Sequence, residues 1–217
     1  MSWERARPLT KIQTTGQKVM ILIPHKGESG YRQWERWWRN DLIKLPGTAW
    51  FEQRGLSLTT NRTGLITEAL KSDAEYFFFL DDDVMGPNNL LTTLLSHQLP
   101  IVCGLYMSKK RKEERGLAAW MKVRSNGYAA IAPEQAARMV QVDVTGLGCC
   151  LLHRSIFERV PPPWFVWEFG GISEDFYFFE KVFKEINVKP IIDMSLKCHH
   201  IGTFLLDVDN TFTTLEI

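Results

Sequence analysis

The chain has 217 residues, of which 45% are apolar and 24% are charged, and its formal net charge is +1. This length is enough for one sizeable core, and the near-neutral charge provides no global field that would favour nucleic acid. No apolar run approaches the roughly 18 residues of a membrane helix, and the N-terminus lacks the apolar core of a signal peptide. We therefore expect a cytoplasmic protein without a transmembrane segment, consisting of an N-terminal extension (1–17) and one domain (18–217).

The cysteines show no spacing typical of a metal site. There are four, and Cys149 and Cys150 are neighbours within an apolar run, whereas Cys103 and Cys198 lie far away in the sequence. In a cytosolic protein, cysteines of this kind are most simply buried thiols. The sequence predicts that all four are reduced and buried.

The first quarter of the chain predicts strand, helix and strand. Residues 18–24 read KVMILIP, an apolar run typical of a strand buried on both faces, which ends at Pro24 and is followed by His25. Apolar residues then recur at helical spacing, namely Tyr31, Trp34, Trp38, Leu42 and Leu45. A short strand is expected at about 49–53. A polar loop after the first strand is common at nucleotide sites and equally common as a plain connection.

A second helix is predicted to open at Asn61-Arg62, with a buried stripe formed by Leu65, Ile66, Ala69 and Leu70. A cation at the start of a helix is disfavoured by the helix dipole. A bound anion such as a diphosphate would compensate for Arg62 in this position. The alternative is an ordinary surface arginine.

The strongest signal is the stretch 76–87, which reads YFFFLDDDVMGP. Its apolar run predicts a buried strand, so Asp81, Asp82 and Asp83 would lie at the carboxyl end of that strand, where open α/β sheets place their ligands. Three adjacent carboxylates repel one another unless a cation or hydrogen-bond donors neutralise them. Hard oxygen ligands of this kind suit Mg²⁺ or Mn²⁺.

Other interpretations of the aspartates are weaker. An EF-hand would need ligands where Met85 and Thr92 stand, and a Walker B strand would need a phosphate-binding glycine loop that the chain lacks. A haloacid-dehalogenase-like phosphatase would need threonine at Met85. A solvated acidic turn closing the strand is the plain structural alternative.

The middle of the chain predicts a helix from Pro87, a strand at 101–106, another at 118–123 and a short helix at 133–141. Between the two strands, residues 108–116 read SKKRKEERG, which fits either a solvated loop or a lid that closes over phosphates. The apolar run 142–152 contains Gly146, Leu147 and Gly148. These glycines would let the backbone approach a ligand closely, or they would mark a bulge.

The last part of the chain predicts a loop, a helix and a strand. Three prolines, 161–163, exclude regular structure. Ser173 is a suitable N-cap for a helix that begins with Glu174 and Asp175, although acids in a first turn are favoured by the helix dipole alone. The core face expected for this helix comprises Phe176, Phe179, Val182, Phe183 and Ile186. In a final strand at 191–200, alternation places Leu196, Cys198 and His200 on one face and Lys197 and His199 on the other.

Read in order, FFFLDDDV, IVCGLY, VDVTGLGCCLLHRSIFERV, PPPWF, ISEDFYFFEKV and HHIG resemble a family-2-like GT-A glycosyltransferase. The resemblance runs over about residues 18–202. It implies a single-domain α/β fold, an α/β/α sandwich around a mixed, mostly parallel sheet. It further implies a nucleotide-diphosphate sugar donor such as a UDP- or GDP-sugar, a Mn²⁺ or Mg²⁺ cofactor, and transfer of the sugar to a hydroxyl or amine.

The resemblance also implies roles for individual residues. Asp81 to Asp83 match the D-x-D motif, so that Asp83, with Asp81, would bind the metal, and Asp81 and Asp82 would lie near the ribose or the metal's waters. His200 would complete the metal site. Asp175 would be the general base of an inverting enzyme, and Glu174 would help to bind acceptor. The nucleotide would be held by Pro24, His25 and Arg62, and the donor-sugar and acceptor side would be lined by Gly146, Leu147 and Gly148.

Two other classes stay open. A phosphatase or phosphotransferase would use Asp81 as nucleophile and Asp83 as acid, and a non-catalytic protein would bind a sugar nucleotide or nucleic acid without turnover. The acceptor class, whether glycan, protein, lipid, small molecule or modified nucleic-acid base, and the oligomeric state are not specified by the sequence.

Overall fold

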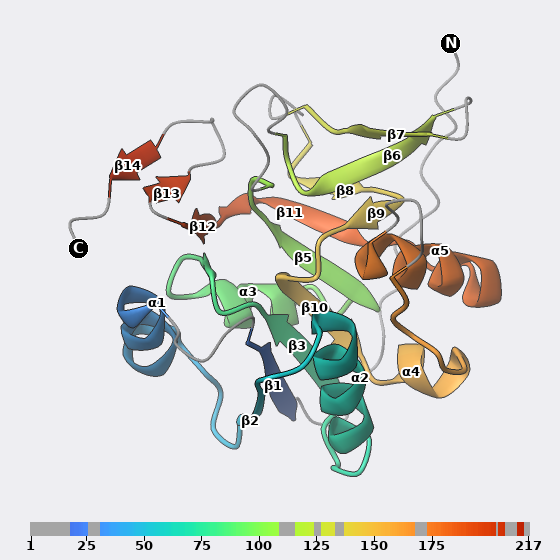
Figure 1. Cartoon of the computed structure of the whole chain (residues 1–217), viewed down its shortest axis with the longest axis horizontal. Helices are drawn as coiled ribbons and strands as arrows, with labels where there is room; N and C mark the ends of the chain where they lie inside the picture. The colour runs from blue at the N-terminus through green and yellow to red at the C-terminus, as the bar shows by residue number, and fades with distance from the viewer. Residues whose placement is uncertain are drawn as a thin grey trace.

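A seven-stranded sheet runs through the middle of the computed structural model, with its strands in the order β2-β1-β3-β10-β5-β11-β8 (Figure 1). The structure describes residues 18–25, 31–108, 116–123, 127–132, 137–167, 173–202, 204–206 and 212–214. The strands of the central sheet are β2 (Ala49–Gln53), β1 (Val19–Pro24), β3 (Tyr76–Leu80), β10 (Cys149–His153), β5 (Ile101–Leu105), β11 (Ile191–Lys197) and β8 (Met139–Gln141). Only β10 and β8 run antiparallel to the other strands of this sheet.

The central strands are buried on both faces because helices cover each side. Alternate residues of β3 contribute to two separate cores: Phe77 and Phe79 face one core, whereas Phe78 and Leu80 face the other. The first core is covered by α2 (Leu58–Ala69), α4 (Ser155–Arg159) and α5 (Glu174–Ile186). The second is covered by α1 (Arg32–Arg36), the π-helical turn η1 (Trp37–Asp41) and α3 (Leu90–Ser96). The expected α/β/α sandwich with a mixed, mostly parallel sheet is confirmed.

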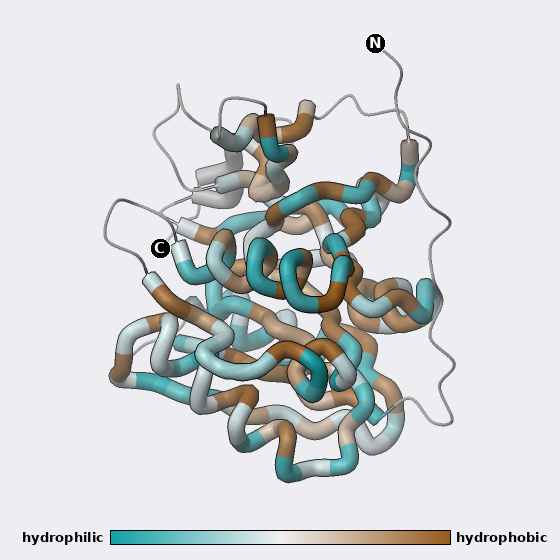
Figure 2. The backbone as a smooth tube through the Cα atoms, turned by 90° about the vertical axis from the view of Figure 1, so that its right-hand side faces the viewer, coloured by the Kyte–Doolittle hydropathy of each residue, from teal (hydrophilic) through white to brown (hydrophobic). Residues whose placement is uncertain are grey.

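The hydropathy of the chain agrees with this layered arrangement, since apolar and polar stretches alternate along the backbone (Figure 2). The tryptophans of the first helical segment are buried: Trp34, Trp37 and Trp38 are at most 6% exposed. In the described part of the chain, no helix is long and apolar enough to span a bilayer.

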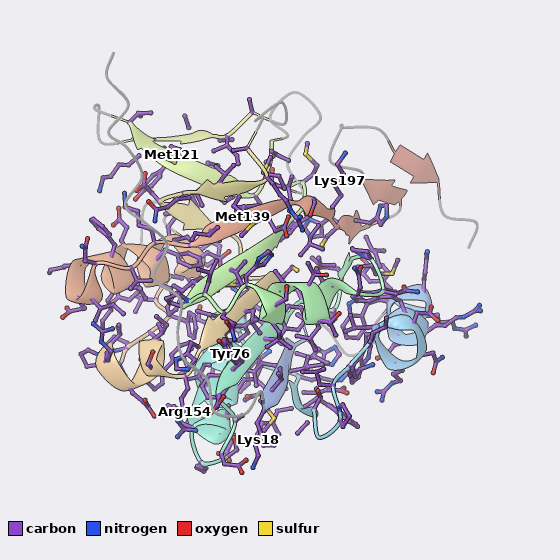
Figure 3. The ribbon with its side chains drawn as sticks, turned by 180° about the vertical axis from the view of Figure 1, so that it is seen from behind. Lys18, Tyr76, Met121, Met139, Arg154 and Lys197 are labelled. Carbon is purple, nitrogen blue, oxygen red and sulfur yellow. The ribbon has the colours of Figure 1, made fainter. Side chains whose placement is uncertain are left out.

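Two small sheets extend the carboxyl edge of the central sheet. In one, β4 (Val84–Met85) pairs with β12 (His199–Ile201), which continues to β13 (Phe204–Leu206) and β14 (Phe212–Thr214). In the other, β6 (Ala119–Val123) pairs with β7 (Gly127–Ala130) and with β9 (Val144–Thr145). Figure 3 marks opposite ends of the central strands, with Tyr76 at the start of β3 and Lys197 at the end of β11. The first small sheet therefore brings the segment after β11 next to the segment after β3.

Several predicted boundaries differ from the observed ones. The second helix begins at Leu58 rather than Asn61, because the Ser57 hydroxyl accepts the Thr60 N–H (3.2 Å) and caps the helix one turn earlier. The third helix begins at Leu90 rather than Pro87. The short helix expected at 133–141 is wrong for its last part, since Met139–Gln141 forms β8 and pairs with β11 at the sheet edge. Residues 133–136 lie outside the described residues.

The buried face of α5 is rotated from the predicted one. Phe179 and Val182 are buried as expected, but Phe178 replaces Phe183, which is 44% exposed. The cause lies at the start of the helix, where Glu174 points inward and is only 2% exposed. Residues four apart share a helix face, so an inward Glu174 also turns Phe178 and Val182 inward.

Candidate active site

The three consecutive aspartates each face a different basic side chain. The Asp81 oxygens lie 3.0 and 3.1 Å from Arg62 Nη2, and Asp82 Oδ2 lies 3.0 Å from His25 Nδ1. Asp83 Oδ1 lies 3.4 Å from His200 Nε2. All three aspartates are at most 7% exposed. The repulsion anticipated from the sequence is therefore relieved at Asp81 by the Arg62 cation, while Asp82 and Asp83 each face a histidine ring.

Arg62 connects the aspartates to the start of α5. Its Nη1 donates to Glu174 Oε1 (2.5 Å) and to Asp175 Oδ1 (2.7 Å), while Nη2 binds Asp81. Burial opposes the guanidinium charge, but Asp81, Asp175 and Glu174 outweigh it and raise the pKa of Arg62. We call Arg62, Asp81, Glu174 and Asp175 the arginine cluster.

The position of Arg62 corrects the expectation from the sequence. Because α2 begins at Leu58, Arg62 lies more than one turn inside the helix, and it is 1% exposed. It is therefore not a surface arginine, and it does not lie at the start of the helix. Its charge is already balanced by carboxylates of the protein.

Asp175 has the properties of a general base. Burial raises its pKa to about 7, the Arg62 cation acts against this shift, and the charges of Glu174 and Asp81 add to it. A hydrogen bond with the Leu147 backbone acts in the lowering direction. The Asp175 side chain keeps 20% of its surface exposed, so a proton can reach it. A carboxyl group with a pKa near the working pH can both accept and release a proton.

Glu174, which was expected to help bind the acceptor, is buried rather than open to solvent. It is 2% exposed, and one of its oxygens is held by Arg62. Its other oxygen, Oε2, has no hydrogen-bond partner among the described residues. A buried carboxylate oxygen without a partner is costly, so Glu174 is held at this place by its contact with Arg62.

The glycine turn packs against Tyr106, a residue that was not among the predicted site residues. The Gly148 N–H donates to the Tyr106 hydroxyl (3.0 Å), and a Cβ on Gly146 would lie 2.1 Å from the same oxygen. A Cβ on Gly148 would also lie 3.1 Å from Asp81 Oδ2. The close approach expected from these glycines is therefore made to Tyr106 and Asp81. Leu147 itself is fully buried, and its backbone contacts Asp175.

Tyr106 also reaches the histidine strand, since its ring lies edge-on to His200 with centroids 5.4 Å apart. Burial raises the pKa of Tyr106 well above its usual value, and the charges of Asp81 and Asp175 add to the shift. The hydroxyl therefore stays protonated and acts as a hydrogen-bonding group. The signal that could have found it is a tyrosine at the carboxyl end of a buried strand.

A second cluster of polar side chains surrounds His25 at the end of β1. The ring nitrogens of His25 lie 3.0 Å from Asp82 Oδ2 and 3.2 Å from Glu52 Oε2. The buried Asn61 side chain donates to the His25 carbonyl (3.1 Å), and its own Oδ1 has no hydrogen-bond partner among the described residues. Pro24, the last residue of β1, brings His25 to this position. This cluster around His25 thus lies next to the arginine cluster, because Asp82 of the one directly follows Asp81 of the other.

Of the three metal ligands expected from the sequence, Asp83 and His200 face each other and suit a metal ion, whereas Asp81 does not. His200 Nδ1 faces the Met107 carbonyl at 2.7 Å and is the donor of that contact, which leaves Nε2 directed at Asp83 Oδ1. A ring nitrogen fixed in this way by a carbonyl is a common arrangement for metal-binding histidine. Both Asp81 oxygens are bound by Arg62 instead. No group of three or more possible metal-binding side chains occurs within the described ranges.

The alternation predicted for residues 196–200 is confirmed, but the single strand expected at 191–200 is divided into β11 of the central sheet and β12 of the small sheet. Leu196, Cys198 and His200 are buried, whereas Lys197 is exposed and His199 is half-buried. His200 lies opposite Val84 in the pairing of β12 with β4, immediately after the aspartates. The basic stretch 109–115 and residues 168–172 lie outside the described residues.

A surface groove of about 790 Å³ lies along α5, away from these groups. Its lining includes Lys122, Tyr128, Tyr177, Lys184 and Lys189. None of the arginine cluster, Asp83 or His200 lines it. The chemistry of the carboxylates, rather than the size of this groove, identifies the candidate active site.

The sheet order and its layers define a GT-A-type fold. Among solved structures, the chain is similar to A197 from STIV, with a TM-score of 0.66 and 21% identity over 93% of this chain and 95% of that chain. It is also similar to GalNAc-T7 crystallised with UDP, GalNAc and Mn²⁺, with a TM-score of 0.56 and 11% identity over 88% of this chain and 45% of that one. At such identities the likeness establishes the fold. No protein-family profile and no curated protein sequence matches the chain.

Proposed function

We propose that the protein is a metal-dependent glycosyltransferase that moves a sugar from a UDP- or GDP-sugar to a hydroxyl or amine. The observation that carries the proposal is the convergence of Asp83 with His200, and of Asp81 with Asp175, from segments far apart in the chain. It is supported by the GT-A-type fold and by GalNAc-T7, whose structure contains UDP, GalNAc and Mn²⁺.

Asp83 and His200 would hold the cation. One carboxylate oxygen and one imidazole nitrogen suit Mn²⁺ or Mg²⁺, whose other positions are usually taken by phosphate oxygens and water. A cation in this place would offset the charge that develops on the leaving diphosphate. Asp82, His25 and Pro24 would bind the nucleotide beside it.

Asp175 would take the acceptor's proton. Its pKa of about 7 matches this role, because below that pH it is protonated and above it the carboxylate is free to accept. In this assignment Arg62 orients Asp175 and Asp81 through its two terminal nitrogens, and Glu174 balances the cation. A base that removes the acceptor's proton during direct attack on the sugar corresponds to inversion at the anomeric carbon.

The phosphatase alternative has less support. A nucleophilic Asp81 needs an oxygen that can reach a phosphorus atom, but both of its oxygens accept hydrogen bonds from Arg62, and the side chain is nearly buried. The carboxylate is therefore better suited to positioning than to attack.

Donor binding tests the proposal directly. Thermal shifts with UDP-, GDP- and dTDP-sugars, with and without Mn²⁺, should show stabilisation by one nucleotide class that increases when the metal is present. Calorimetry should then show that His200→Ala weakens metal-dependent donor binding, while His199→Ala, on the opposite strand face, does not. Asp83→Asn should weaken it further, since it removes a charge. Equal binding and turnover after EDTA treatment would refute the metal site.

A further inference from the structure

The four cysteines form two close pairs on opposite faces of the central sheet. Cys103 Sγ and Cys150 Sγ lie 3.0 Å apart, and Cys149 Sγ and Cys198 Sγ lie 3.9 Å apart. The first pair belongs to the core beneath α2 and α5, the second to the core beneath α1 and α3. Residues next to each other in the chain, Cys149 and Cys150, therefore have different partners.

Strand register brings the first pair together. β10 and β5 are antiparallel neighbours, and Cys150 is the direct partner of Cys103. Directly opposed residues of antiparallel strands have Cα atoms about 4.5–5.5 Å apart, which lies within the range of disulfide-bonded cysteines. Closing 3.0 Å to a bond of about 2.05 Å requires a side-chain movement of about 1 Å.

A glycine makes room for the second pair. Cys149 lies on β10 and Cys198 follows β11, so β5 runs between them. A Cβ on Gly104 of β5 would lie 2.8 Å from Cys149 Sγ and 3.0 Å from Cys198 Sγ. The two sulfur atoms thus meet above Gly104, but two strand spacings of about 4.8 Å separate the backbones that carry them, which is farther than a disulfide spans. This second pair is a contact between two thiols.

Two other uses of these thiols fit poorly. A zinc site needs four ligands around one ion, but each sheet face supplies two sulfurs, and no metal-binding group of three was found among the described residues. A reactive nucleophile needs exposure and a low pKa. All four thiols are at most 1% exposed, and burial with the Cys150 contact raises the pKa of Cys103, while the Cys149 contact with burial raises that of Cys198.

We propose that Cys103 and Cys150 are the site of a disulfide bond that fastens β10 to β5 in the core beneath α2 and α5.

The bond forms by exchange with a low-molecular-weight disulfide such as oxidised glutathione. One cysteine thiolate attacks a glutathione sulfur and releases one glutathione thiolate, giving a mixed disulfide. The paired cysteine, having lost its proton, then attacks the protein sulfur of that mixed disulfide and releases the second glutathione. Two electrons pass to glutathione as the bond forms. Burial requires that this happens during folding, before the two cores close.

The thiol count of the whole chain tests the proposal without any activity assay. Reduced protein is unfolded, refolded in a glutathione redox mixture, and alkylated in denaturant before mass spectrometry. We expect two alkylated cysteines without a reductant and four when a reductant is added first, and a melting temperature about 5–10 °C higher for the oxidised form than for the reduced form. Four alkylated cysteines after refolding would overturn the proposal.

Double variants assign the bond, because trypsin does not cut between Cys149 and Cys150. Cys149→Ala/Cys198→Ala should retain the bond, whereas Cys103→Ala/Cys150→Ala should retain two free thiols. The mismatched control Cys103→Ala/Cys149→Ala keeps one sulfur on each sheet face and should also retain two free thiols. Bond formation in the control as complete as in Cys149→Ala/Cys198→Ala would contradict the assigned pair.

Discussion

The protonation of Asp175 gives a prediction that separates stability from activity. Its pKa in the folded protein is about 7, whereas the usual value is 3.8. Between these values the unfolded chain releases the proton and the folded protein keeps it, so stability falls as the pH rises from about 4 to about 7 and is constant above. About three pKa units at about 1.4 kcal/mol each give a loss on the order of 4 kcal/mol.

Asp175→Asn should remove this dependence while keeping the side chain's size and its contact with Arg62. For a chain of 217 residues, 4 kcal/mol corresponds to a change in melting temperature on the order of 10 °C. The difference between the melting temperatures at pH 4.5 and pH 8 should therefore be smaller in the variant than in the wild type, by about this amount. Asp41→Asn, at an exposed position, is the matched control and should leave the wild-type difference unchanged.

The same variant should lose transfer activity by about 10²- to 10⁴-fold while binding donor nearly as well as the wild type. In the wild type, kcat/KM should rise with pH through about 7, because the carboxylate form is the base. Parallel melting profiles for the variant and the wild type would refute the assignment of the buried proton to Asp175. Turnover equal to the wild type would remove Asp175 from the mechanism.

Three further substitutions test the surroundings of the site. Arg62→Met should cost about 3–5 kcal/mol in urea unfolding, since it leaves buried carboxylates without their cation, while the exposed Arg36→Met should cost less than about 0.5 kcal/mol. Tyr106→Phe should cost about 1–3 kcal/mol, because the Gly148 N–H loses its acceptor; an unchanged unfolding midpoint would argue against that bond. Gly146→Ala should destabilise the fold through its clash with the Tyr106 hydroxyl, and the double variant with Tyr106→Phe should be less destabilised than the two single effects added together.

Local sequence patterns were enough to predict the framework of the site. The uninterrupted apolar run before Asp81 predicted a fully buried strand, and strict alternation in the last strand correctly placed His200 inward and Lys197 outward. Both features depend on residues adjacent in the chain. The helix prediction for residues 139–141 was wrong because these residues pair with β11, about 50 residues later, and their own composition does not indicate this pairing.

The partners within the site could not be predicted in the same way. The contact of Arg62 with Glu174 spans 112 residues, and that of His200 with the Met107 carbonyl spans 93. The helix that carries Arg62 also starts earlier than expected, so Arg62 lies in its second turn, and its side chain is buried. The place of Tyr106 after a buried strand does not reveal its partner, because its contact is made by a glycine turn that follows β9.

The position of β10 has a consequence for how the chain reaches its folded state. β3 and β5 follow one another in synthesis, yet in the sheet they are separated by β10, which lies more than 40 residues beyond β5. Until that later segment emerges from the ribosome, the facing edges of two wholly apolar strands have no partner for their backbone groups. A nascent chain that ends before residue 149 therefore exposes a template for strand addition by other molecules. We expect such truncated chains to aggregate and to need a chaperone, whereas the full-length chain fills the gap with its own strand.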